Sequence, residues 1–127
     1  MILKLGLLIF LVEMTSSLTT TPSNVSLVEG PNPHSGNVMV DGLPVCDDNW
    51  DDADGVVVCR QLGYIGLEQV TTGSTFGTVY NDFAMDGVEC SGFEDRLDDC
   101  PFYQAGDFCG INTGAGVICV PGLIPFS

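Results

Sequence analysis

Apolar positions in this chain fall into short runs separated by loops that are rich in glycine, proline and asparagine. Residues 26–30 and 36–40 are two such runs on either side of a Pro/Asn/Gly loop, a pattern typical of two strands joined by a turn. Residues 43–46 can form a third strand. Two later runs, residues 87–90 and 116–119, end in a cysteine and are also predicted to be strands.

The pattern changes at residue 51, where acidic residues precede an apolar stretch. Asp51, Asp52 or Asp54 can cap a helix, and Gly63 can end it. The three consecutive valines at residues 56–58 favour a strand instead. We expect a helix, although the residues alone leave both structures open.

Two further segments are predicted to be largely irregular. Residues 71–80 are rich in glycine, threonine and serine, which is consistent with an extended, loop-rich stretch, and residues 94–99 can form one helical turn. The sequence contains no internal repeat and no low-complexity block. These features together predict one compact α+β domain with many loops.

The first residues have the layout of a secretory signal peptide. Lys4 precedes an apolar run at residues 5–12, and a Ser/Thr-rich stretch follows at residues 15–21, so we expect cleavage near Ser17. A membrane anchor is the alternative, but a spanning helix needs about 20 apolar residues. Glu13 ends this run well before that length, so direct membrane insertion is not predicted.

The chain then divides into a signal peptide at residues 1–17, a polar linker at 18–25, a domain at 26–120 and a short tail at 121–127. Asn24 begins an Asn-Val-Ser sequon, which predicts N-glycosylation at an exposed site. We expect a secreted, extracellular protein, associated with a membrane only if the chain is a truncated receptor.

Six cysteines lie in the last two thirds of the chain, and an even number behind a signal peptide predicts three disulfides. Six cysteines allow 15 pairings, and spacing does not select one. A zinc site would need close pairs of cysteines with histidines nearby. Every gap here is eight residues or more, and the only histidine, His34, is distant in sequence, so structural zinc is not expected.

The charge balance limits the partners that the protein can attract. Seventeen acidic residues and three basic ones give a formal net charge of −14. Lys4 lies in the signal peptide, so only Arg60 and Arg96 remain, and nucleic acids or polyanions are held by clustered basic residues. Nucleic acid is therefore excluded as a direct partner, and an anionic partner would need a bridging cation. Most of the acids serve solubility.

Five segments in order carry a specific resemblance: LVEGPNPHSGNV, CDDNW, VVCRQLGY, VECSGFEDRLDDC and AGVIC. Together they closely resemble the scavenger receptor cysteine-rich domain, over residues 26–120. The resemblance implies a small disulfide-stapled α+β fold, loop-rich, in which a curved antiparallel sheet cradles one main helix. It also supports the helix after residue 51.

Tyr64 follows Leu-Gly at the position where an eight-cysteine subgroup has an additional cysteine, so the chain resembles the six-cysteine subgroup. That subgroup implies the pairs Cys46–Cys109, Cys59–Cys119 and Cys90–Cys100. The chain departs from the family before Cys46, where the segment is short and lacks a common tryptophan. It departs again at residues 110–115, where the family usually has a histidine and an acidic pair.

The resemblance further implies a Ca²⁺ site. In the family, two aspartates and a glutamate form it, and they match Asp47, Asp48 and Glu94 here; a second site would share Asp48 and add Asp86. Calcium takes six to eight oxygen ligands, which suits clustered carboxylates. The alternative is that these acids cap the following helix or accept backbone hydrogen bonds in turns.

Other chemistries find no support in the sequence. An EF-hand with Gly55 at its sixth position would have Trp50 at the first and Gln61 at the twelfth, where acidic ligands are required. Trp50 is better interpreted as a core residue. His34 has no G-x-S-x-G or similar motif near it, and the adjacent acids have no sugar-binding cleft in evidence. An enzyme is not predicted.

The function that the resemblance implies is ligand binding. We expect a secreted recognition module of the scavenger or pattern-recognition type that binds an extracellular protein or a microbial-surface ligand through a calcium-supported acidic surface. One alternative is an accessory domain of a larger receptor or secreted protease, of which this chain would be a truncated form. The other is a structural extracellular component without a dedicated ligand.

Overall fold

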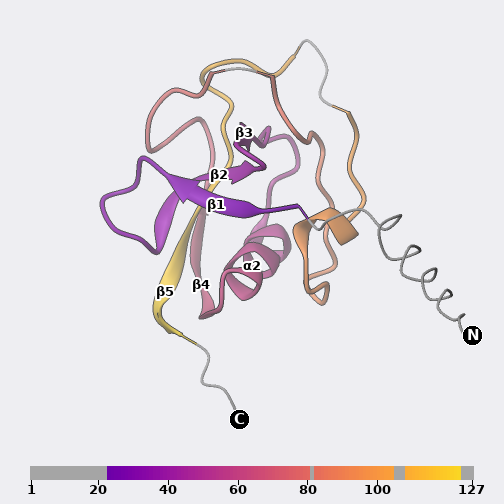
Figure 1. Ribbon diagram of the computed structural model, residues 1–127. Coiled ribbons are helices and arrows are strands. Elements are labelled where there is room, and N and C mark those ends of the chain that lie inside the picture. Colours follow the sequence, from indigo (N-terminus) through magenta and orange to yellow (C-terminus); the bar gives the residue numbers. More distant parts are fainter. Residues whose placement is uncertain (1–22, 81, 105–107, 124–127) are drawn as a thin grey trace, which may run out of the picture.

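The computed structural model describes residues 23–80, 82–104 and 108–123 of the chain (Figure 1). Its elements in order are β1 (Val25–Val28), β2 (Ser35–Val40), β3 (Leu43–Pro44), α2 (Asp52–Gln61), β4 (Tyr64–Thr71), the 3-10 helix η2 (Leu97–Asp99) and β5 (Gly116–Leu123). The expected signal peptide and its cleavage point lie outside the described residues. Within the described residues, no helix has the length and apolar character needed to cross a bilayer.

The strands form one antiparallel sheet in the order β1-β2-β5-β4, and β3 pairs with β2 outside this path. The strands predicted at residues 26–30, 36–40 and 116–119 are confirmed as β1, β2 and β5. Strand β4 was not predicted. Its register against β5 shifts twice, between Tyr64 and Gly66 and between Leu67 and Gln69, and such irregularities increase the local twist of a sheet.

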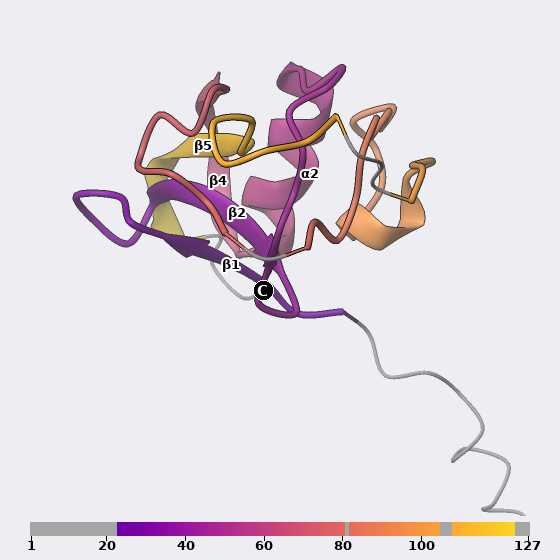
Figure 2. The ribbon, with the colours of Figure 1, turned by 90° about the horizontal axis from the view of Figure 1, so that it is seen from above.

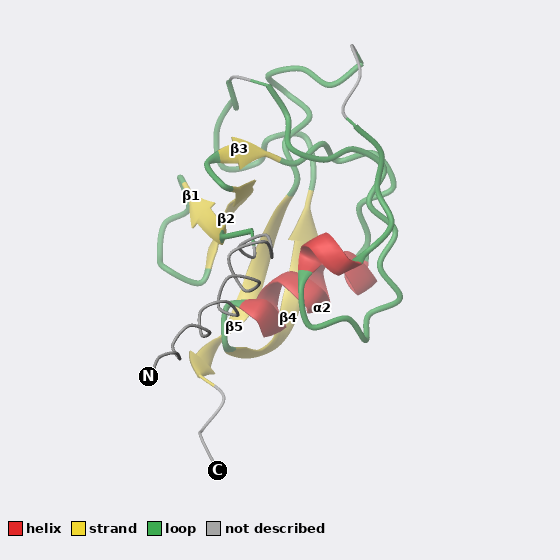
Figure 3. Cartoon of the chain, turned by 45° about the vertical axis from the view of Figure 1, so that its right-hand side comes forward, coloured by secondary structure: helices red, strands yellow, loops and turns green. Residues whose placement is uncertain are grey.

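Helix α2 packs against β4 and β5 on one side and η2 on the other. Figure 2 shows α2 between the sheet and the long loops that carry η2, and Figure 3 shows the loops gathered at one end of the sheet. The expected fold, a sheet that cradles one main helix in a loop-rich domain, is confirmed.

A reciprocal capping box explains why residues 52–61 are helical despite their valines. The Asp51 side chain accepts a hydrogen bond from the Asp54 N–H, and the Asp54 side chain accepts one from the Asp51 N–H. These two bonds satisfy backbone donors that a helix start leaves free. Gly63, with φ of 90°, follows the helix end. The capping prediction is confirmed, with Asp51 as the N-cap.

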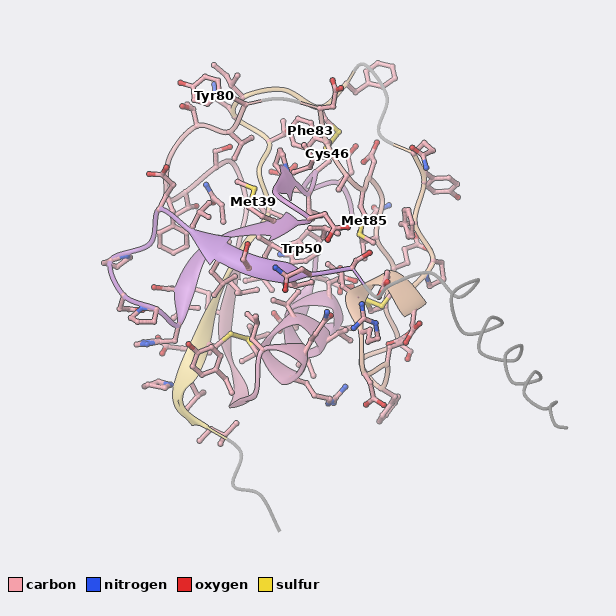
Figure 4. The ribbon with its side chains drawn as sticks, viewed as in Figure 1. Met39, Cys46, Trp50, Tyr80, Phe83 and Met85 are labelled. Atoms are coloured by element: carbon pink, nitrogen blue, oxygen red, sulfur yellow. A yellow bond between two sulfur atoms is a disulfide. The ribbon has the colours of Figure 1, made fainter. Side chains whose placement is uncertain are left out.

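The core lies between the sheet and α2. Val57, Val58, Val38 and Val117 are fully buried there. Trp50 is 6% exposed, and its Nε1–H donates to the Gly116 carbonyl in β5 over 2.9 Å, so its interpretation as a core residue is confirmed. Figure 4 labels Trp50, close to the strands and above α2 in that view.

The strand predicted at residues 87–90 is wrong. Gly87 has φ of 59°, outside the strand region. The residues on either side of it form backbone pairs with two different segments. Met85 bridges to Val45 and Asp86 to Tyr103, while the Glu89 N–H donates to a carbonyl of the segment after Cys100. The turn predicted at residues 94–99 is present in shorter form, as η2.

Three disulfides join Cys46 to Cys109, Cys59 to Cys119 and Cys90 to Cys100, and no cysteine is free. They are the pairs that the resemblance implied. Cys59 lies in α2 and Cys119 in β5, so this bond ties the helix to the sheet. The other two bonds hold the loops from which the candidate ligands project.

Candidate functional site

Two of the four predicted calcium ligands lie close together. Carboxylate oxygens of Asp48 and Asp86 are within 4.8 Å of each other and of the sulfurs of Cys46 and Cys109. These sulfurs form a disulfide, so the carboxylates are the donors that remain for a cation. The backbone sets this proximity, because the Cys46 N–H donates to the carbonyl of Met85, the residue before Asp86, over 2.9 Å. Cys46 and Met85 are labelled in Figure 4.

Asp47 forms hydrogen bonds with two other loops. Its Oδ2 accepts a hydrogen bond from the Gly73 N–H at 2.7 Å, and its own N–H donates to the Thr113 carbonyl at 2.9 Å. Its carboxylate is not part of the group formed around Asp48 and Asp86. Asp47 thus takes the backbone-bonding role that was the alternative to calcium.

Glu94 also binds backbone donors. Its carboxylate accepts hydrogen bonds from the N–H groups of Ser91 and Gly92 at 3.0 to 3.1 Å. These bonds, above all that of Ser91, lower the pKa of Glu94 to about 2, because they favour the charged form. Glu94 groups with the Cys90–Cys100 disulfide and not with Asp48. The predicted trio of Asp47, Asp48 and Glu94 is therefore not brought together.

Asp54 is a buried acid that fixes the position of the segment at Cys90. It has no exposed surface, and its two oxygens accept the N–H groups of Cys90 and Asp51, each at 2.8 Å. Desolvation raises the pKa of Asp54 to about 7, against the opposing effect of these two donors. The sequence indicated Asp54 as a possible cap but gave no sign of its bond to Cys90, which is 36 residues away.

A hollow of about 490 Å³ lies where the turn before α2 meets the segment that ends at Cys90. Its lining residues are Asn49, Trp50, Asp51, Glu89 and Cys90. Sequence reasoning did not predict it, because its two walls are about 40 residues apart in the chain and are joined by the bond between Asp54 and Cys90. We refer to it below as the Asn49–Cys90 groove.

Both arginines are engaged in contacts within the fold. Arg60 donates to the Glu94 carbonyl at 2.7 Å. Arg96 donates to the Ser23 carbonyl at 2.7 Å and forms an ion pair with Asp98 at 3.0 Å. Neither arginine is among the described residues that line the groove.

The predicted glycosylation site is accessible. Asn24 is exposed at the start of β1, and its backbone N–H donates to the Asp41 carboxylate at 2.8 Å. Its side chain therefore lies where a glycan can be attached, and occupancy stays a prediction.

Comparison with known proteins places the chain in a family. The model of the scavenger receptor cysteine-rich domain matches residues 28–120. A scavenger receptor cysteine-rich domain superfamily protein of Patiria pectinifera is 41% identical in an alignment over 102 residues that covers 76% of this chain and 9% of that protein. The chain thus spans a small part of that relative's length.

Two solved structures are similar in fold. The third SRCR domain of murine neurotrypsin is 39% identical, with a TM-score of 0.70 over 76% of this chain and 95% of that one. The dimeric form of the SRCR domain of mouse MARCO is 27% identical, with a TM-score of 0.56 over 84% and 98%. Given these matches and the three disulfides, the chain belongs to the scavenger receptor cysteine-rich family, in its six-cysteine form.

Proposed function

We propose that this chain is an extracellular ligand-binding module of the scavenger or pattern-recognition type. Calcium would support its acidic edge, by which we mean the surface at Asp48 and Asp86. Domains of the family are commonly extracellular ligand-binding modules and not enzymes. The observation that carries the calcium part is the approach of the Asp48 and Asp86 carboxylates to within 4.8 Å. Secretion through the N-terminal segment and glycosylation at Asn24 remain predictions within this proposal.

The spacing of Asp48 and Asp86 suits a shared calcium ion. Calcium binds oxygen at 2.3–2.6 Å, so two ligands of one ion lie at most about 4.6 to 5.2 Å apart. The carboxylate donor type also suits a hard cation. Asp47 and Glu94 lie outside the group that contains Asp48 and Asp86, so we assign the site first to Asp48 and Asp86. Bound calcium would supply the positive charge that an anionic ligand group needs at this acidic edge.

A thermal-shift experiment tests the calcium site. Extracellular calcium sites have dissociation constants of about 0.1 to 1 mM, so about 10 mM calcium should stabilise the fold by about 1.4 to 2.7 kcal/mol. The double change Asp48→Asn, Asp86→Asn should abolish the rise in Tm. A control, Asp52→Asn with Glu68→Gln, removes two exposed charges elsewhere and should keep the rise.

The change Asp47→Asn with Glu94→Gln tests the family's trio separately. Retention of the calcium shift would assign the ion to Asp48 and Asp86, whereas its loss would mean that the trio converges when calcium binds. No shift in the unmodified protein would contradict the calcium proposal altogether. Capture of microbial cells by the protein, with and without a chelator, then tests whether calcium serves ligand binding.

An accessory role within a larger protein is the second candidate. It is favoured by the small share, 9%, that the chain covers of the Patiria relative, and by the neurotrypsin domain being the third in its chain. Sequencing of the complete transcript tests this candidate, because further domains in the same reading frame would support it.

A further inference from the structure

Three residues form a row across the sheet. Gly116 in β5 pairs with Asn37 in β2 on one side and with Thr71 in β4 on the other. Paired residues of neighbouring strands project to the same face of a sheet, so Asn37 and Thr71 lie on either side of Gly116. Because glycine has no side chain, no group at position 116 separates the two polar side chains. We refer to these three residues as the Asn37–Thr71 row.

The Asn37–Thr71 row lies on the face of the sheet that turns away from α2. Val70, the residue before Thr71, is next to Gly55 of α2, where a Cβ would lie 2.5 Å from Val70 Cγ1, and successive residues of a strand point to opposite faces. The loop after β4 reaches the row, since Asn37 Nδ2 donates to the Gly77 carbonyl at 2.8 Å. Asn37 is fully buried and Thr71 is 7% exposed, so the row is shielded from bulk solvent.

Two oxygens of the row are buried without a protein partner. Thr71 Oγ1 and Asn37 Oδ1 form no hydrogen bond with any described residue. Both lie next to Gly116, because a Cβ added there would contact Thr71 Oγ1 most closely and would lie 3.3 Å from Asn37 Oδ1. The Gly36 carbonyl oxygen is the third oxygen at this point, at 2.8 Å. Buried polar side-chain atoms bond in the large majority of cases to protein or to ordered water, so we expect a partner other than a protein atom.

We propose that the Asn37–Thr71 row binds an ordered water molecule over Gly116. Buried waters make about three hydrogen bonds, and three oxygens meet at this point. The water would donate to Asn37 Oδ1 and to the Gly36 carbonyl oxygen, and would accept from the Thr71 hydroxyl. Gly36 pairs with Val117 in the sheet, but a carbonyl oxygen has two lone pairs and can accept a second bond. Water thus satisfies each of the three groups.

Water suits this site better than a cation. Calcium takes six to eight oxygen ligands, whereas three oxygens meet here and none of them is charged. The water would also fix the orientation of the Asn37 amide, with Oδ1 on the water and Nδ2 on the Gly77 carbonyl. It would therefore support the loop after β4, which also binds Asp47 through the Gly73 N–H. The water site uses no carboxylate, so it is independent of the calcium part of the proposed function.

A high-resolution crystal structure of the disulfide-bonded protein, grown in EDTA, tests the proposal directly. We expect electron density for a water within about 3.0 Å of both Thr71 Oγ1 and Asn37 Oδ1. Absence of such density, or a direct hydrogen bond between the two side chains, would overturn the proposal. Contacts of about 2.3 to 2.6 Å would identify a cation in place of water and would overturn it as well.

The sign of a change in stability gives a second test in solution. Thr71→Val replaces the hydroxyl with a methyl group of similar size and removes one partner of the water. Because a polar group left unpaired in the core destabilises the fold, we expect Tm to fall by about 4 °C or more. Without a bound water, the same change would remove an unpaired buried hydroxyl and would raise Tm, which contradicts the proposal.

Thr72→Val is the matched control, because it makes the same chemical change at the exposed neighbouring residue and should leave Tm nearly unchanged. Hydrogen exchange adds a local readout. The Gly77 amide, which donates to the Ser74 carbonyl, should lose protection in Thr71→Val and keep it in Thr72→Val. Equal effects of the two variants on Tm and on Gly77 would show that the row holds no water. Because EDTA is present throughout, failure of the calcium proposal would not alter any of these results.

Discussion

At the scale of single residues, Asp54 shows how one buried carboxylate can join distant segments. It accepts backbone donors from the helix start and from Cys90, and it is fully buried. Two opposing effects set the pKa of Asp54. The two hydrogen bonds stabilise the ionised form, and desolvation by burial disfavours that form. Glu94 is the converse, because exposed backbone donors around it lower its pKa to about 2.

The raised pKa of Asp54 predicts a specific dependence of stability on pH. The pKa rises from 3.8 to about 7 on folding, so between these values the folded state holds more protons than the unfolded one. The free energy of unfolding contributed by Asp54 therefore falls as pH rises through this range, by at most about 1.4 kcal/mol per pH unit. Asp54→Asn does not titrate, so the stability advantage of the parent over it should shrink between pH 4 and pH 7.

Urea unfolding of both proteins at pH 4, 5.5 and 7 measures this difference. Glu94 loses its contribution as pH falls from its unfolded pKa of 4.5 towards about 2. Both proteins contain Glu94, so this loss cancels in the difference between them. A constant difference across the range would show that Asp54 is ionised in the folded state down to pH 4.

At the scale of elements, the contact between α2 and β4 depends on Gly55. A Cβ at this position would lie 2.5 Å from Val70 Cγ1 and 2.9 Å from Leu67 Cδ1. Gly55→Ala gains about 1 kcal/mol of helix propensity but overpacks the interface, which costs about 1 to 3 kcal/mol. We expect a net loss of about 1 kcal/mol in denaturant unfolding.

Gly66→Ala is the matched control for this prediction. It places a methyl group in β4 at ordinary contact distance, 3.8 Å from Val120, and should be neutral or stabilising. An equal loss in both variants would point to β4 itself and not to the helix contact.

The elements differ in how far their sequences determine them. β1, β2 and β5 were predictable because their apolar runs are short and bounded by glycine or loop residues. β4 was missed because its two register shifts disturb the alternation of apolar and polar positions that marks a strand. Residues 87–90 resemble a strand in composition, but Gly87 has a positive φ, which no apolar pattern reports.

The candidate site was predictable only in part, because contacts between segments that are distant in sequence form it. The resemblance to the family supplied Asp48 and Asp86, but the residues alone could not place them together, since their approach depends on pairing between Cys46 and Met85. The engagement of Asp47 with Gly73 and of Glu94 with Ser91 also depends on loop geometry. The groove likewise arises from contacts between segments that are distant in sequence.

At the scale of the whole molecule, two of the disulfides connect different parts of the fold. Cys59–Cys119 closes 60 residues and ties α2 to β5, whereas Cys90–Cys100 closes 10 residues within the loops. Chain-entropy arguments give about 4 kcal/mol for the longer closure and about 3 kcal/mol for the shorter one. The two disulfides thus contribute similar amounts to the free energy of unfolding, but one connects α2 to the sheet and the other connects two loop segments.

Their removal should therefore have different consequences. Cys90→Ala with Cys100→Ala should lower the unfolding free energy by about 3 kcal/mol and still leave the sheet and α2 folded, because neither cysteine lies in them. Cys59→Ala with Cys119→Ala should cost about 4 kcal/mol and also leave cavities between α2 and β5, where both cysteines are fully buried. Urea unfolding and hydrogen exchange of β5 amides measure both effects. Loss of β5 protection in the Cys90/Cys100 variant would mean that the loops support the sheet, and that the two halves fold as a single unit.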